Sequence, residues 1–93
     1  MTTQASAVSV TGTGVVQAGP CTLRGLSIRD TSGSGNTVKL YDNASAASGT
    51  VLFAYALAAN GTTPPLTIDG GLRAAAGLYL SATGAVEGSV WIA

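Results

Sequence analysis

The side chains that could carry chemistry are few, and their densest group lies in the segment DTSGSGN, residues 30–36. Oxygen-bearing side chains recur there at every second position: Asp30, Ser32, Ser34 and Asn36. Alternate oxygen ligands are typical of a calcium loop, but such a loop carries more charge and ends on a bidentate glutamate. Asp30 is the only charged residue of the segment and no such glutamate follows it. The pattern therefore favours a hairpin loop, and we expect no metal site.

The sequence contains few of the residue types that carry out catalysis. The chain has no histidine and a single cysteine, so Ser–His and Cys–His nucleophile pairs and a Cys/His zinc site are absent. Its four carboxylates are Asp30, Asp42, Asp69 and Glu87. The three aspartates stand beside Gly, Ser or Asn at expected strand ends, where Asp bonds nearby backbone N–H groups. We expect no enzyme activity, no catalytic residue and no cofactor, and we expect Cys21 to be a small buried apolar side chain.

Charge is the unusual feature of the composition. Only 9% of the 93 residues are charged and the formal net charge is zero, whereas soluble domains carry about 25% charged residues. An uncharged surface promotes association, so we expect a protein bound to copies of itself or to a larger body. The alternative is a monomer that Ser, Thr and Asn side chains keep hydrated.

The same composition bears on other partners. The basic residues form no stripe, so direct nucleic-acid binding is not expected. The longest apolar run, VLFAYALAA (51–59), is far shorter than the roughly 20 residues of a membrane helix. The N-terminal residues have no basic start and no long apolar stretch, so we expect neither a secretory signal nor membrane association.

Short apolar runs separated by turn residues predict seven or eight β-strands. The expected strands are 6–12, 14–19, 21–30, 36–42, 50–58, 65–69, 77–83 and 85–93. This spacing predicts an all-β fold: a compact antiparallel β-sandwich, Greek-key or jelly-roll-like. We expect residues 1–93 to form one such domain, with 1–6 as a flexible N-terminal arm. ATGA (82–85) is expected to be a tight hairpin turn between the last two strands.

Alternation within the strands predicts finer features. The apolar phase shifts between Leu23 and Leu26, which predicts a β-bulge near Gly25. Residues 50–58 are apolar on both faces, which places this strand centrally or at a subunit contact. The predicted core consists of Leu26, Ile28, Val38, Leu40, Phe53, Leu78, Leu80, Val90 and Ile92.

Residues 21–93 also resemble a known class of proteins. The strand ending in GLSIRD, the following VKLYDN, a short Ala/Ser/Gly turn, GTVLF, and GLYL leading into the last strand resemble small virion proteins from the structural gene blocks of tailed bacteriophages. The resembling residues belong to strands and turns and include no functional motif. The resemblance implies a structural component of a phage particle, and within it a capsid decoration, or cement, protein.

A decoration protein of this kind sits on the outer head surface and clamps neighbouring shell subunits. The resemblance thus implies the major capsid protein as partner, a homo-oligomer with a trimer as the single most expected state, and a virion location after synthesis in the host cytoplasm. A tail, neck or fibre component is the first alternative. A carbohydrate- or receptor-binding module with Trp91 and the tyrosines as a stacking platform is the second.

The expected partner contacts are uncharged polar residues on the arm and two loops, with one tryptophan. They are Thr2, Thr3, Gln4, Ser32, Ser34, Asn36, Asn60, Thr62, Thr63 and Trp91. The arm is either ordinary terminal disorder or a segment that becomes ordered on binding, adding a strand to the edge of a neighbouring subunit. In that second case main-chain hydrogen bonds supply affinity without charged side chains.

Overall fold

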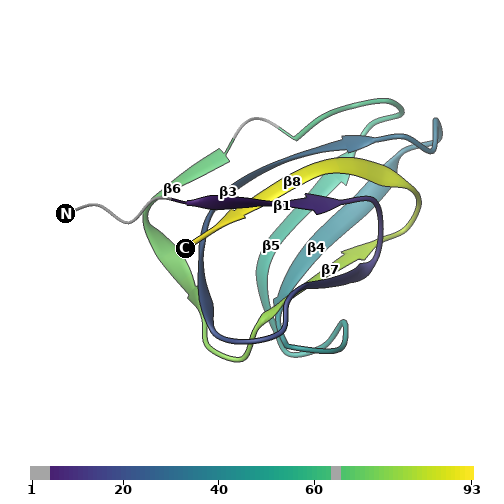
Figure 1. Ribbon diagram of the computed structural model, residues 1–93. Coiled ribbons are helices and arrows are strands. Elements are labelled where there is room, and N and C mark those ends of the chain that lie inside the picture. Colours follow the sequence, from purple (N-terminus) through teal and green to yellow (C-terminus); the bar gives the residue numbers. More distant parts are fainter. Residues whose placement is uncertain (1–4, 64–65) are drawn as a thin grey trace.

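Eight strands and no helix make up the part of the chain that the computed structural model describes, residues 5–63 and 66–93 (Figure 1). The strands are β1 (Ser6–Val10), β2 (Gly14–Gln17), β3 (Cys21–Asp30), β4 (Asn36–Asp42), β5 (Thr50–Leu57), β6 (Leu66–Ala74), β7 (Leu78–Ala82) and β8 (Val86–Ile92). The all-β prediction is confirmed. No described segment forms a helix long and apolar enough to cross a membrane.

The strands form two antiparallel sheets that pack face to face. Sheet A has the order β1-β8-β3-β6 and sheet B has the order β2-β7-β4-β5. The first strand therefore pairs with the eighth, the second with the seventh, the third with the sixth and the fourth with the fifth. A chain doubled back at the β4–β5 hairpin and then rolled up produces this order, which is the jelly-roll arrangement. Because β1 and β8 are antiparallel neighbours, the start of β1 lies beside the end of β8, where Ser6 pairs with Ile92 (Figure 1).

Two turns that were predicted to be hairpins connect different sheets instead. Residues 31–35 lead from β3 in sheet A to β4 in sheet B, and residues 83–85 lead from β7 in sheet B to β8 in sheet A. The predictions were wrong because Gly and Ser turn residues allow the chain to reverse but do not specify which sheet the next strand joins.

The predicted bulge at Gly25 is confirmed, since the pairing of β3 with both β6 and β8 shifts between Leu23 and Gly25. The sixth strand was expected at 65–69 but continues to Ala74. Gly70 and Gly71 both have a φ of 78°, a left-handed conformation that interrupts the strand without ending it. The two glycines therefore break the strand locally, and its pairing with β3 resumes at Leu72.

The core lies between the sheets and contains eight of the nine predicted side chains. Leu26, Ile28, Val38 and Leu40 are completely buried, and Cys21 is buried as expected. Phe53 is only half-buried and packs against the margin of the core. The cause is the position of β5, which forms the edge of sheet B. The central position proposed for this strand is thus wrong, and a subunit contact stays a prediction.

Candidate interaction surface

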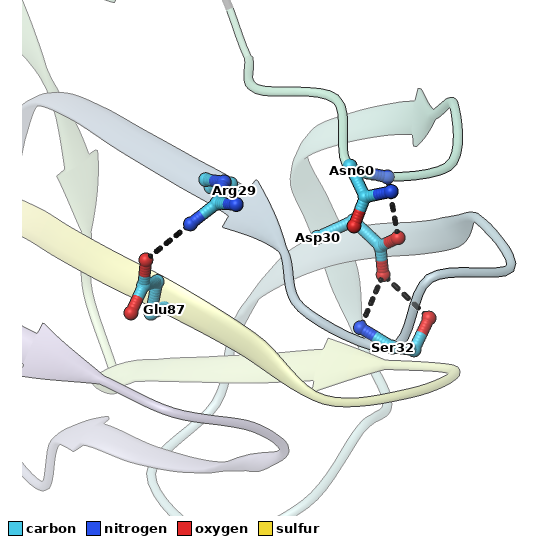
Figure 2. Close-up of polar contacts among 5 residues, drawn as sticks. All are labelled: Arg29, Asp30, Ser32, Asn60 and Glu87. Carbon is cyan, nitrogen blue, oxygen red and sulfur yellow. Dashed lines mark hydrogen bonds and ion pairs between the residues drawn. The ribbon is translucent and has the colours of Figure 1, made fainter.

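Asp30, the last residue of β3, organises the loops at one end of the sandwich. Its side chain is completely buried and accepts hydrogen bonds from three neighbouring segments. Oδ1 accepts from the Ser32 N–H at 3.1 Å, the Ser32 hydroxyl at 2.6 Å and Asn36 Nδ2 at 3.0 Å. Oδ2 accepts from the backbone N–H groups of Gly33 at 3.2 Å, Gly35 at 3.3 Å and Asn60 at 3.0 Å. Figure 2 shows Ser32 and Asn60 reaching this carboxylate from different loops.

These donors stabilise the ionised carboxylate. The Ser32 hydroxyl contributes most, followed by the Asn36 amide and the Asn60 N–H, and together they hold the pKa of Asp30 well below its usual range. The predicted turn role of Asp30 is confirmed. An Asp followed by Ser and Gly is the local signal for such a turn, but the bond from Asn60 comes from a distant loop and has no local signal.

Asn36 joins a third loop to this cluster. Its Nδ2 donates to Asp30 Oδ1 and, at 3.1 Å, to the Ala85 carbonyl oxygen. Its Oδ1 accepts from the Thr83 hydroxyl at 3.2 Å and the Gly84 N–H at 2.9 Å. The loops 31–35, 58–63 and 83–85 are therefore held together by one buried amide and one buried carboxylate.

The segment before β6 is bonded along the end of β3. The Thr63 N–H donates to the Ile28 carbonyl at 2.8 Å, and the Ile28 N–H donates to the Thr63 hydroxyl at 3.0 Å. The Asp30 N–H donates to the Gly61 carbonyl at 2.8 Å. Thr63 is buried as a result, while Thr62 stays exposed.

The structure thus brings six of the predicted contact residues to one end of the sandwich. Four of them are exposed: Ser32, Ser34, Asn60 and Thr62. Asn36 and Thr63 are buried, and their polar atoms serve the loops themselves. Trp91 is half-buried on β8, away from these loops, and donates to the Ser89 hydroxyl at 2.9 Å. Thr2, Thr3 and Gln4 lie outside the described residues.

The exposed sides of the two sheets differ in charge. Sheet A carries an ion pair between the cross-strand neighbours Arg29 and Glu87, 2.8 Å apart and half-exposed (Figure 2). Arg24 and Arg73 also belong to its strands. The strands of sheet B contain only Lys39 and Asp42, and Asp42 accepts a bond from the Ala76 N–H at 2.8 Å at the end of β4.

Sheet B instead carries a row of apolar and aromatic residues that spans all four strands. Val15 pairs with Tyr79, Tyr79 with Tyr41, and Tyr41 with Val51. The two valines at the ends of the row are 49% and 47% exposed, and the tyrosines are half-buried. We call Val15, Tyr79, Tyr41 and Val51 the aromatic row. Alternation along residues 36–42 predicts that Tyr41 lies on the face opposite to Val38 and Leu40, but its partners depend on pairing between distant strands.

The free edge of sheet B is apolar as well, although Phe53 and Tyr55 lie opposite the core residues Leu40 and Val38 and not on the face of the aromatic row. β5 has no charged residue, and Tyr55 on it is 37% exposed. The rings of Phe53 and Tyr55 stack with centroids 6.3 Å apart and an interplanar angle of 2°.

Within the described residues there is no pocket and no group of three or more His, Cys, Asp or Glu side chains that could hold a metal ion. No family model, curated protein or solved structure matches this chain.

Proposed function

We propose that this chain is a structural virion protein, and specifically a capsid decoration protein that binds the outer head shell of a tailed bacteriophage and stabilises it. The resemblance of residues 21–93 to small phage virion proteins supports this proposal. The jelly roll is compatible with it, since viral capsid domains are among the proteins that use this fold, although a fold alone does not specify a function.

The observation that carries the proposal is the exposed aromatic row on sheet B. Contiguous apolar surface on a small domain marks an interaction site. The row combines two exposed valines with two tyrosines, and tyrosine is enriched where proteins meet. We assign the aromatic row to the contact with the major capsid protein. The exposed polar residues Ser32, Ser34, Asn60 and Thr62 lie beyond the other end of sheet B, where Asn36 pairs with Leu57, and we propose them as a second, polar contact.

Stabilisation follows from binding the assembled shell in preference to its separate subunits. Each contact is small, because one face of a 9.1 kDa chain is small. An oligomer that engages several shell subunits at once raises the effective concentration and therefore the overall affinity.

The first test is to find the protein in purified particles. Quantitative mass spectrometry of heads and tails, separated from particles whose genome encodes this chain, should detect many copies on heads. A few copies confined to tails would favour the tail, neck or fibre alternative. Absence from particles would overturn the proposal.

The second test addresses the surface. Val15→Lys adds a charge at an exposed end of the aromatic row and should abolish attachment to heads that lack the protein. Ser9→Lys, at an exposed position of β1 in sheet A, is the matched control and should attach normally. Equal attachment by both variants would show that the aromatic row is not the contact.

The arm hypothesis needs a separate deletion. Ser6 already belongs to β1 and pairs with Ile92, so removing residues 2–4 spares the strand, whereas removing residues 2–6 shortens it. If the arm adds a strand to a shell subunit, the shorter deletion should weaken attachment. Undiminished attachment would leave the arm without a role in binding.

The carbohydrate alternative gains no support from the arrangement of the aromatic residues. Trp91 belongs to sheet A, whereas Tyr41, Tyr55 and Tyr79 belong to sheet B. The tryptophan and the tyrosines therefore do not form the single stacking platform that this alternative assumed.

A further inference from the structure

The four edge strands of the sandwich differ in how they are protected against pairing with another chain. β1 has five residues, and β2 has four with a register shift between Val15 and Gln17. β6 is interrupted at Gly70–Gly71 and carries Asp69 and Arg73. Short strands, bulges and charges of this kind are how natural proteins prevent edge-to-edge pairing.

β5 has less of this protection than the other edges. It runs for eight residues, TVLFAYAL, with no charge, glycine or proline. Its pairing with β4 shifts once, near Leu52, and from Phe53 to Leu57 the pairing is regular. An edge strand presents a row of N–H and C=O groups that another strand can pair with. A long, apolar and uncharged edge is the feature expected where a protein adds a strand from a partner.

We propose that β5 pairs with β5 of a second copy of this chain, antiparallel and about a two-fold axis. The two copies of sheet B then form one continuous sheet of eight strands. This proposal does not depend on the proposed attachment to a phage head, because it is argued from the edge strand β5 alone.

The side chains of β5 are self-complementary for such a contact. Phe53 and Tyr55 stand opposite Leu40 and Val38 of β4, on the core side, while Ala54 and Ala56 alternate with them on the outer side. A two-fold axis places core-side residues opposite core-side residues and alanines opposite alanines. Aromatic residues paired across strands stabilise a sheet, and a strand without charge places no like charges opposite each other.

The exposure of Tyr55 favours a second copy as the occupant. Tyr55 stands opposite Val38 on the core side, yet it is 37% exposed, so the rest of the chain leaves more than a third of it uncovered. The same edge of a copy brings an equivalent Phe53–Tyr55 pair to this position. The zero net charge of the chain also removes the long-range repulsion that would oppose association of two copies.

The test is sedimentation of the isolated protein at micromolar concentration. The wild type should sediment at twice the 9.1 kDa chain mass. Ala54→Lys should sediment as a single chain, because Ala54 is exposed on β5 and the substitution places like charges within the paired edge. Ala7→Lys is the matched control, since it adds the same charge at an exposed alanine of another edge strand, and it should stay at the mass of two chains.

Two further results complete the test. An equimolar mixture of Ala54→Lys and Ala54→Glu should recover the two-chain species. Circular dichroism of each variant should match the wild type, and Ala56→Lys, also at an exposed alanine of β5, replaces any variant that does not fold. A wild type that sediments as one chain would overturn the proposal, as would an Ala54→Lys variant that keeps the two-chain mass. A species of three chains would also overturn it, because a two-fold contact closes at two chains, and would favour the trimer implied by the resemblance.

Discussion

At the scale of single residues, the buried carboxylate of Asp30 shows how the loops at one end of the sandwich can be ordered with almost no charge. Six hydrogen bonds from Ser32, Gly33, Gly35, Asn36 and Asn60 converge on it. A carboxylate that accepts several backbone N–H bonds is stabilised in its ionised form. The exposed polar residues of the proposed second contact are therefore held in place by a residue that does not itself face solvent.

This arrangement makes stability depend on pH. The pKa of Asp30 is lower in the folded protein than in the unfolded chain, where an aspartate has a pKa of about 3.9. Its contribution to stability is therefore fully present above that pH and declines as the pH falls towards the folded pKa. Urea unfolding of the wild type and Asp30→Asn at pH 7 and at low pH should show the variant less stable at pH 7, with the difference shrinking in acid. A difference that does not change with pH would contradict the prediction.

Gly88 illustrates a backbone constraint at the same scale. It lies in β8 with a φ of 149°, and a Cβ there would overlap the Ser27 carbonyl oxygen on the neighbouring strand. Gly88→Ala should destabilise the protein by about 1–3 kcal/mol, because the strands must separate to admit the methyl group. Gly12→Ala is the control, since no heavy atom lies near the position of its added Cβ. Equal urea midpoints for the two variants would refute this account.

At the scale of the elements, alternation within each strand predicted the core well. β4 shows why: Val38 and Leu40 are completely buried, while Lys39 between them is not. The exception, Phe53, alternates in the same way, but it belongs to an edge strand that has neighbours on one side only. Periodicity identifies the face of the sheet on which a side chain lies, but it does not tell whether the strand has neighbours on both sides.

Leu40 tests this account of the core. It is completely buried on a strand that has a neighbour on each side. Leu40→Ala should lower the free energy of unfolding by about 2–5 kcal/mol, through lost burial and the cavity that remains. Val15→Ala, at a position 49% exposed, should lower it by less than about 1 kcal/mol. Chemical denaturation measures both, and similar losses would mean that the assigned strand phase is wrong.

At the scale of the whole molecule, the jelly roll is a fold of distant pairings. Ser6 pairs with Ile92, and Gly14 pairs with Leu80. Strands so far apart in the sequence must close long loops before their contacts stabilise the fold. We therefore expect β1 and β8 to pair late in folding, after most of the other strands have formed their contacts.

Refolding should be slow for a chain of 93 residues. Domains dominated by non-local β-pairing fold in about milliseconds to seconds, whereas local helical folds reach microseconds. Trp91 lies on β8, which joins β1 to β3, so its fluorescence should report the late closure of sheet A. Stopped-flow dilution from urea measures this rate, and complete recovery of the native signal within microseconds would contradict the prediction.

The sequence by itself determined the strands, the bulge at Gly25, the turn role of Asp30 and eight of the fifteen apolar residues that are buried in the described part of the chain. These features follow from alternation and turn chemistry, which act over a few neighbouring residues. The tertiary structure alone decided that residues 31–35 and 83–85 cross between sheets, that β5 is an edge, and that Tyr41 and Tyr79 lie side by side. It also decided that Asn60 reaches Asp30. The physical reason is that these outcomes depend on which distant strands pair. Many pairings satisfy the same local pattern, and only the packing of all eight strands around one core selects among them.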